Sequence, residues 1–174
     1  KDKKIKKNII INVTKKHQVG SDRIVNAIGS LNYYKKNCII IDFGTATTFD
    51  VALIKDIYQG GIIAPGINLS LKSLSEFTAK LPLIKIFFQK NVIGKDTKSA
   101  INSGVYIGYS CLINGIIDKI IKQTKKKYLV VLTGGYSKIF KKNINYKTVI
   151  NKNVTLHGLA TTVRGNKKIF NEIR

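Results

Sequence analysis

The sequence is poor in several residue types, and each shortage excludes a class of protein. Its 174 residues include two cysteines, two prolines and no tryptophan or methionine. Cys38 and Cys111 lie in apolar contexts without metal-ligand spacing, which excludes a disulfide-rich secreted scaffold and predicts free thiols in a reducing cytoplasm. No apolar run approaches the ~20 residues of a membrane span, and no signal-peptide pattern follows Lys1. We therefore expect a cytoplasmic protein with no membrane partner.

The lack of methionine bears on where the chain starts. A chain without methionine does not begin at a translation start, so we expect that a segment before Lys1 has been removed, left out or never encoded. At 174 residues, the chain fits either one domain with a workable core or a piece of a larger, two-lobed protein.

Acidic residues and arginine are also scarce. Nine Asp and Glu face 31 Lys and Arg, giving a net charge of +22, which by itself would suggest nucleic acid or an anionic surface. Only Arg23, Arg164 and Arg174 are arginine, whereas base recognition relies on arginine forks. The lysines are spread along the chain among abundant Ile and Asn, as an AT-rich genome imposes. We expect no specific nucleic-acid partner, with a basic nucleic-acid-binding module as an open alternative.

The apolar residues that are present alternate between strand-like and helix-like spacing, which predicts an α/β fold. A helix begins near Ser21, the predicted N-cap, and the turn at residues 55–56 separates two strands of a β-meander. The expected strands are residues 8–13, 38–41, 47–54, 58–63 and 128–133. One expected helix runs from residue 67 until Leu81-Pro82 ends it, and another spans residues 97–122. Gly104, Gly108 and Gly115 share one side of the last helix. They predict close approach of another backbone, either a crossing inside the fold or a dimer contact.

The most informative stretch is residues 39–50, where an apolar run ends in Asp42 and is followed by Gly44 and three threonines. Glycine lets an oxyanion approach the backbone N–H groups, threonine hydroxyls donate to phosphoryl oxygens, and the aspartate can hold a cation. The stretch therefore indicates a phosphate and cation site. A β-hairpin with threonine on its solvent face is the alternative.

Three further residues allow two interpretations each. Asp22 in a first helical turn fits a general base, or a carboxylate that compensates the helix dipole. Arg23 fits a substrate contact or a surface ion pair. Thr97 fits a substrate contact or the N-cap of the long helix.

Taken together, four segments closely resemble the type III pantothenate kinases of bacteria. They begin with Gly20-Ser21-Asp22-Arg23 and with Asp42-Phe43-Gly44-Thr45, and the resemblance covers about residues 18–158. The others are residues 60–66, with residues 78–82 and 92–97 downstream, and residues 132–135.

The resemblance implies a fold, an activity and a set of partners. The fold is that of the acetate-and-sugar-kinase, heat-shock-ATPase and actin superfamily: α/β and ribonuclease-H-like, with a mixed sheet flanked by helices. The implied activity transfers the γ-phosphoryl group of ATP to pantothenate, the first step of coenzyme A biosynthesis. The family is dimeric and cytoplasmic, and it uses Mg²⁺ with ATP and a monovalent cation, K⁺ or NH₄⁺.

The resemblance also implies roles for individual residues. Asp22 matches the general base and Asp42 the monovalent-cation ligand. The pantothenate contacts are implied to be Gly20, Ser21, Asp22, Arg23 and Thr97, and the ATP-binding residues Gly44, Thr45, Gly134 and Gly135.

One part of the family pattern is missing. The family begins with a strand and an Asp-x-Gly-Asn-Thr phosphate loop, and nothing in residues 1–16 matches it. We therefore expect an incomplete N-terminal lobe, with the first lobe ending within about residues 1–36 and the second spanning about residues 37–174. We expect this 174-residue chain alone to be inactive. A non-catalytic relative that acts as an accessory transcription factor stays an alternative.

Overall fold

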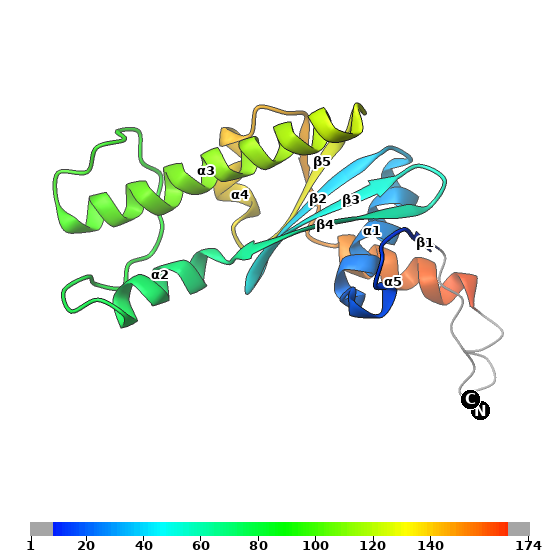
Figure 1. The fold of residues 1–174 in the computed structure, drawn as a ribbon, viewed down its shortest axis with the longest axis horizontal. Coiled ribbons are helices and arrows are strands. Elements are labelled where there is room, and N and C mark those ends of the chain that lie inside the picture. The colour runs from blue at the N-terminus through cyan, green and yellow to red at the C-terminus, as the bar shows by residue number, and fades with distance from the viewer. Residues whose placement is uncertain (1–8, 167–174) are drawn as a thin grey trace.

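A single mixed β-sheet organises the part of the chain that the structure, a computed structural model, describes, residues 9–166. Within these residues the sheet has six strands in the order β1-β4-β3-β2-β5-β6. Figure 1 shows helices on both sides of the sheet and an arm that projects beyond one end of it. The strands are β1 (Ile10–Ile11), β2 (Cys38–Phe43), β3 (Ala46–Leu53), β4 (Ile57–Pro65), β5 (Leu129–Gly134) and β6 (Thr148–Ile150).

The central strands form the predicted meander. β2, β3 and β4 pair antiparallel, and Lys55 and Asp56 make the β3–β4 turn with φ values of 74° and 56°. β5 then pairs parallel to β2, and β6 parallel to β5, while the short β1 pairs parallel to β4. The parallel β2 and β5 therefore end at the same edge of the sheet, where Asp42 lies opposite Thr133.

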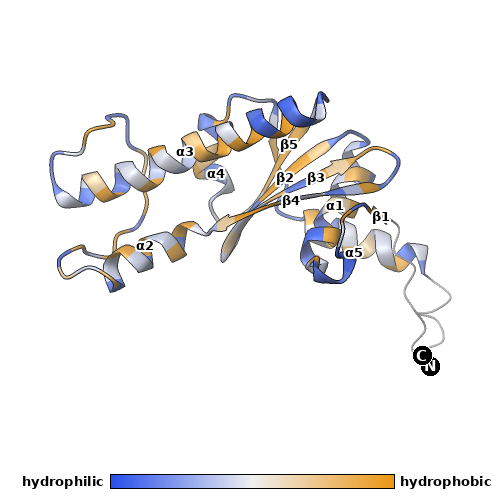
Figure 2. Ribbon diagram, in the orientation of Figure 1, coloured by the Kyte–Doolittle hydropathy of each residue, from blue (hydrophilic) through white to orange (hydrophobic). Residues whose placement is uncertain are grey.

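The two faces of the sheet have separate apolar cores, and Figure 2 shows hydrophobic residues concentrated along the strands. On one face, α1 (Ser21–Tyr34) packs against the sheet, and α5 (Val154–Gly165) packs against α1. On the other, α2 (Ile67–Glu76), α3 (Thr97–Thr124) and α4 (Ser137–Phe140) share the second core. Two short 3-10 helices, η1 (Lys16–Gln18) and η2 (Lys141–Asn143), complete the described elements. The predicted mixed α/β architecture is confirmed.

Close backbone contact occurs between α1 and α5 and not along α3. A Cβ on Gly29 would lie 2.2 Å from the carbonyl oxygen of Val154, and one on Gly158 would lie 1.9 Å from that of Val25. By contrast, the Cβ positions of the three α3 glycines meet no heavy atom within 4 Å outside their own helix, among the described residues. The prediction of a crossing inside the fold was wrong for α3, and the dimer contact stays a prediction.

Three predicted helix ends differ from the structure. The N-cap of α1 is Gly20 and not Ser21, which is already helical. α2 ends at Glu76, well before Pro82, with Phe77 as its C-cap. The N-cap of α3 is Asp96 and not Thr97, because the Asp96 carboxylate accepts from Ser99 N at 2.9 Å in a capping box.

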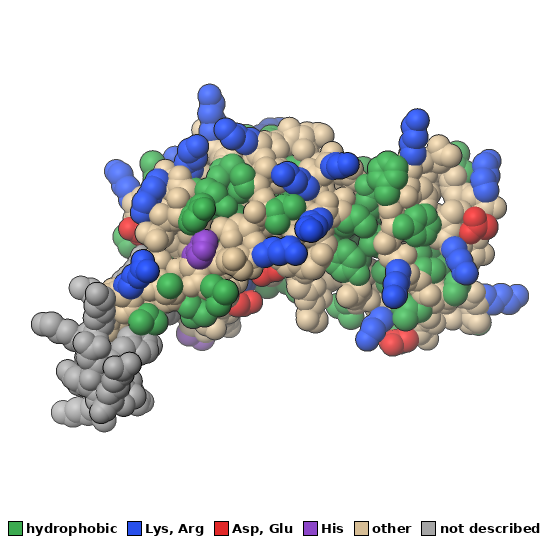
Figure 3. All heavy atoms as spheres, turned by 180° about the vertical axis from the view of Figure 1, so that it is seen from behind, with side chains coloured by type: hydrophobic (Ala, Val, Ile, Leu, Met, Phe, Trp, Pro, Cys, Tyr) green, Lys and Arg blue, Asp and Glu red, His purple; other side chains and the backbone are tan. Residues whose placement is uncertain are grey.

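The arm consists of α2, residues 77–96 and the N-terminal half of α3. It carries large apolar side chains in solvent, and Figure 3 shows such side chains among scattered lysines on its rear face, at the right of that view. These side chains include Leu69, Phe77, Leu83, Phe88, Val92 and Ile93, of which Phe77 is 85% exposed. α3 is long and apolar enough to cross a bilayer by length and composition, but half of its most apolar window is buried inside the structure, as in the core helix of a soluble fold.

Candidate active site

The candidate site begins at the N-terminus of α1, where Gly20 and Asp22 occupy adjoining space. A Cβ on Gly20 would lie only 2.5 Å from Oδ1 of Asp22. The Asp22 carboxylate therefore folds back over the start of the helix, and a larger residue at position 20 would displace it. No side chain caps α1 by a hydrogen bond. The exposed Asp22 carboxylate is the acidic group of the first turn of this helix.

Asn26, one turn further along α1, connects the helix to the sheet. Its Nδ2 donates to Oδ2 of Asp42 at 3.0 Å, and its Oδ1 accepts from the Thr155 hydroxyl at 2.7 Å. The side chain is fully enclosed, with 1% of the residue exposed. Asn26 therefore ties α1, β2 and α5 together at one point and brings Asp22 close to Asp42.

Asp42 lies at the carboxyl end of β2, in register with Thr48 of β3 and Thr133 of β5. Burial raises the pKa of its carboxyl; the amide of Asn26 opposes this shift, and the negative charge of Asp22 adds to it. A partly buried carboxylate with a second negative charge beside it is an arrangement that a bound cation relieves. Residues 9–166 hold no cluster of three or more His, Cys, Asp or Glu side chains that could bind a metal ion.

The predicted phosphate segment is a β-hairpin whose tip is Gly44-Thr45. Gly44 N donates to the Ala46 carbonyl at 3.2 Å, and both tip residues are exposed. The backbone of this segment is therefore the β-hairpin that the alternative interpretation predicted. Thr47, however, is fully buried, and its hydroxyl has no hydrogen-bond partner among the described residues, so it does not face solvent.

Gly134 and Gly135 pack against the base of this hairpin. Gly134 has φ +82°, and a Cβ there would lie 2.5 Å from the Phe43 carbonyl oxygen. Gly135 N donates to the same oxygen at 3.2 Å. Only glycine at position 134 allows the end of β5 and the end of β2 to meet this closely.

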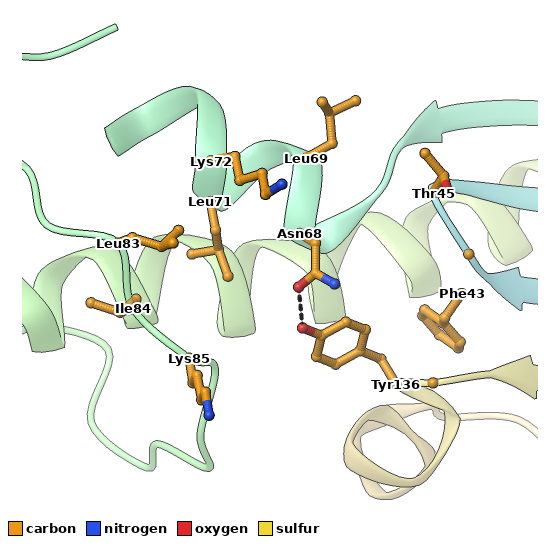
Figure 4. A pocket seen from close by; sticks show the side chains of 12 residues that line it. Phe43, Thr45, Asn68, Leu69, Leu71, Lys72, Leu83, Ile84, Lys85 and Tyr136 are labelled. Carbon is orange, nitrogen blue, oxygen red and sulfur yellow. Dashed lines mark hydrogen bonds between the residues drawn. The ribbon is translucent and has the colours of Figure 1, made fainter. Parts of the chain in front are cut away.

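A cavity of about 630 Å³ opens beside these glycines. Figure 4 shows α2 and residues 83–85 on one side of it and Tyr136 on the other, with the Tyr136 hydroxyl donating to Asn68 Oδ1. Its lining is apolar apart from the hairpin tip, the Asn68–Tyr136 pair and two lysines. The lining residues are Phe43, Gly44, Thr45, Asn68, Leu69, Leu71, Lys72, Leu83, Ile84, Lys85, Gly135 and Tyr136.

Arg23 forms a buried ion pair and not a surface one. Its Nε donates to Oδ1 of Asp50 at 2.7 Å, and the Asp50 side chain is fully buried. The hydroxyls of Tyr58 and Thr48 also donate to this carboxylate, at 2.8 and 3.2 Å. Burial raises the pKa of the Asp50 carboxyl, while Arg23 and both hydroxyls oppose the shift. Burial and the adjacent Asp50 charge also raise the pKa of Tyr58.

The structure brings together most, but not all, of the predicted site residues. Asp42 accepts a hydrogen bond from Asn26 and lies near enough to Asp22 to feel its charge, while Gly44, Thr45 and Gly135 line one cavity with Gly134 at its base. Thr97 lies apart from them: it is exposed at the tip of the arm, at the opposite end of the molecule from α1 (Figure 1).

Sequence reasoning missed several residues of this region. Asn26 stands four residues after Asp22, among apolar positions, and that spacing was a readable signal. Asp50 is a charged residue inside an apolar strand, which was a second signal. The contributions of Lys72 and Tyr136 to the cavity had no sequence signal, because they depend on how α2 and the chain after β5 meet.

Comparison with known proteins identifies the family to which this arrangement belongs. A family model described as type III pantothenate kinase matches residues 1–119. The chain belongs to the type III pantothenate kinase family. It is 46% identical over 164 residues to a type III pantothenate kinase from Pelagibacter ubique (strain HTCC1062), covering 92% of this chain and 65% of that protein. A second, from Sulfurihydrogenibium sp. (strain YO3AOP1), is 42% identical over 155 residues, covering 89% of this chain and 62% of that protein. The chain thus spans less than two-thirds of the length of these pantothenate kinases.

A solved structure supports the fold. A Baf family transcriptional activator from Campylobacter jejuni superposes with a TM-score of 0.66, covering 90% of this chain and 69% of that one, at 22% identity. At that identity the likeness shows the fold alone. The mixed sheet flanked by helices is consistent with the actin-like ATPase fold that the resemblance implied.

Proposed function

We propose that the protein transfers the γ-phosphoryl group of ATP to the primary hydroxyl of pantothenate, giving 4'-phosphopantothenate and ADP. The carrying observation is that Asn26 of α1 hydrogen-bonds Asp42, so that the Asp22 and Asp42 carboxylates share one site beside an exposed Gly-Thr hairpin. Phosphoryl transfer requires mostly positioning and positive charge around the γ-phosphate; this site would supply the positioning, and cations bound there would supply the charge. Relatives named type III pantothenate kinase support the choice of substrate.

Asp22 acts as the general base in this proposal. Its carboxylate accepts the proton of the pantothenate hydroxyl as that oxygen bonds to the γ-phosphorus and the bond to the ADP oxygen breaks. Gly20 leaves room for the carboxylate, and Asn26 fixes the helix that carries it. A positioned base of this kind contributes roughly 10²–10⁴-fold to the rate.

ATP would occupy the cavity of about 630 Å³, with its phosphates at the hairpin tip. The exposed Thr45 offers a hydroxyl donor there, while Gly44, whose N–H already donates to Ala46, leaves the tip without a side chain, and Gly134-Gly135 border the nucleoside side. Lys72 and Lys85 add positive charge to the same cavity.

Two cations belong to the proposal. Asp42 would hold K⁺ or NH₄⁺, which supplies positive charge beside the phosphates. Its buried carboxylate, whose pKa the neighbouring Asp22 charge raises, supports this assignment. Mg²⁺ would arrive with ATP.

Thr97 and the arm support a homodimer. Thr97 is the first residue of α3, whose N-terminal half lies in the arm away from α1 (Figure 1), so it would contact pantothenate bound at Asp22 only from a second copy of the chain. The exposed apolar side chains of the arm, and the open glycines of α3, offer a surface for that copy. Gly20, Ser21 and Arg23 would contact pantothenate from the same copy as Asp22.

We place the protein in the cytoplasm, where both cysteines, buried Cys38 and exposed Cys111, stay free thiols as found here. Figure 3 shows lysines spread over the face that it displays and not gathered in one stripe, which favours a protein without a specific nucleic-acid partner.

The test is the reaction itself, with the full-length protein, ATP, Mg²⁺, K⁺ and pantothenate. We expect ADP release that depends on pantothenate, together with 4'-phosphopantothenate detected by mass spectrometry. ADP release independent of pantothenate, or none at all, would refute the proposal.

A further inference from the structure

Arg23 is held by a network of buried groups that the proposed reaction does not itself require. Asp50 is fully buried in β3, a strand that is otherwise apolar around it. It accepts from Arg23 Nε, from the Tyr58 hydroxyl and from the Thr48 hydroxyl. A buried carboxylate costs free energy unless it is paired, and a well-packed apolar residue would stabilise the strand as well.

Gly61 completes the arrangement from the neighbouring strand. It lies opposite Asp50 in the β3–β4 ladder. A Cβ on Gly61 would lie 2.5 Å from Arg23 Nη2 and 2.9 Å from Asp50 Oδ1. The sheet therefore has a gap at this position that the guanidinium and carboxylate fill, and any other residue would push them apart.

The guanidinium of Arg23 is oriented by Asp50, but not all of its N–H groups have hydrogen-bond acceptors. Its Nη2 lies 2.7 Å from Asp50 Oδ1, an ion pair by distance, yet its N–H groups are not aligned with that oxygen. This buried nitrogen has no hydrogen-bond acceptor among residues 9–166. Buried donors are almost always paired, so an unpaired one next to a cavity indicates a ligand that supplies the acceptor.

Such a cavity, of about 370 Å³, lies beside Arg23. Tyr58 lies against the guanidinium, with its ring centroid 6.0 Å from Cζ, and lines the cavity as well. Lys15 adds a second positive charge to the lining. The full lining is Val13, Thr14, Lys15, Gln18, Val19, Arg23, Tyr58, Gly60 and Gly61.

We propose that Asp50 and Tyr58 are positioning residues that orient Arg23 so that its free N–H groups receive the carboxylate of the substrate in this second cavity. The inference rests on the proposed function, because pantothenate carries a carboxylate at the end opposite its reacting hydroxyl. Asp22 and Arg23 are adjacent on α1, so one helix end serves both ends of the substrate. Asp50 acts through Arg23 and does not touch the reacting atoms.

The test compares pantothenate with its neutral amide, which keeps the reacting hydroxyl and lacks the carboxylate. Asp50→Asn in the full-length protein keeps the volume and removes the charge. We expect the preference in kcat/KM for pantothenate over the amide to fall at least about fivefold, chiefly through KM. In an Arg23→Gln background, the same Asp50 substitution should change the preference by less than about twofold, since its effect passes through Arg23.

If Asp50 had a purely structural role, Asp50→Asn would lower kcat/KM equally for pantothenate and for the amide, through kcat as much as through KM. That result would overturn the inference. If Asp50→Asn fails to fold, Tyr58→Phe removes one hydrogen bond to the carboxylate without changing any charge. It should lower the same preference about two- to threefold, and an unchanged preference in the folded variant would overturn the inference. A wild-type protein that does not phosphorylate pantothenate would refute the proposed function itself, whereas an active wild type with unaffected variants refutes only the role of Asp50.

Discussion

The sheet with α1 and α5 is here called the body. The body and the arm differ in how closely their elements pack against the rest of the chain. In the body, the helices α1 and α5 meet at backbone contact through Gly29 and Gly158, and the buried Asn26 has hydrogen-bond partners on β2 and α5. In the arm, the α3 glycines face open space and Phe77 is 85% exposed. We infer from this comparison that the body fixes the geometry of the candidate site, whereas the arm offers a surface for the proposed second copy.

The largest expected effect tests the close contact within the body. Gly29→Ala should lower the free energy of unfolding by about 3 kcal/mol or more, because the new Cβ would overlap the Val154 carbonyl and force α5 away from α1. Gly104→Ala, the same change in the arm, should raise it by about 0.5–1 kcal/mol, since the site is open and alanine favours helix. Urea unfolding at low protein concentration measures both. Equal changes in the free energy of unfolding for the two variants would show that the body and the arm do not differ in how closely these glycines are packed.

A second prediction concerns Asp42 and potassium. Burial raises the pKa of Asp42, so the folded protein binds this proton more tightly than the unfolded chain does, and stability falls as pH rises from the ordinary carboxyl pKa through the raised one. Potassium should offset this loss only where the carboxyl is ionised. At ten times its dissociation constant it should add about 1.4 kcal/mol at pH 7.5, or roughly 3–5 °C in Tm, and almost nothing near pH 4.

The control is Asp42→Asn, which removes the buried charge and keeps the shape. This variant should be at least as stable as the wild type and show no potassium response in Tm or in activity. Sodium chloride at matched ionic strength separates specific binding from screening. A wild type that responds to neither potassium nor ammonium would remove Asp42 from the cation role.

The arm offers a smaller test of the proposed dimer. Cys111 is exposed and lies on α3 between Gly108 and Gly115, whereas Cys38 is buried. If the α3 glycines meet a second copy, mild oxidation should cross-link two chains through Cys111, and Cys111→Ser should abolish the cross-link. Gly104→Ala should then weaken the dimer in sedimentation experiments. A protein that sediments as a monomer at every concentration would contradict the homodimer.

The weakest expected effect is binding to nucleic acid. The scattered lysines predict an affinity for DNA or RNA that is independent of sequence and collapses between 50 and 200 mM salt, roughly as counterion release requires. Fluorescence anisotropy with two unrelated duplexes measures it. Tight, sequence-selective binding at physiological salt would revive the nucleic-acid alternative.

The sequence predicted the strands and most helices because their signals are local. The apolar run ending at Asp42, the meander and the long α3 helix each depend on residues close in sequence, and the structure has them with small shifts in their ends. What it could not predict depends on distant elements meeting. The close contact of α1 with α5 joins Gly29 to Gly158, while the α3 glycines, which carried the same local signal, meet nothing within the described chain.

The site divides in the same way. Asp22, Asp42 and the hairpin glycines were predicted from motifs, but the link between them is Asn26, whose partners are 16 and 129 residues away. Asp50 was overlooked because its role depends on Arg23 of α1 and on Tyr58 and Gly61 of β4. Thr97 came from family resemblance, and its distance from Asp22 is visible only in the fold (Figure 1).

The central claim is that the α1 N-terminus supplies the base of a phosphoryl-transfer site, and the turnover of pantothenate by the full-length Asp22→Asn variant tests it most directly. Asp56→Asn, the same change in an exposed turn of the body, is the matched control and should keep wild-type turnover. We predict that Asp22→Asn lowers kcat at least tenfold at unchanged Tm, because a positioned carboxylate contributes roughly 10²–10⁴-fold. Near-normal turnover in Asp22→Asn would contradict the account and leave Asp22 as a carboxylate that only compensates the helix dipole.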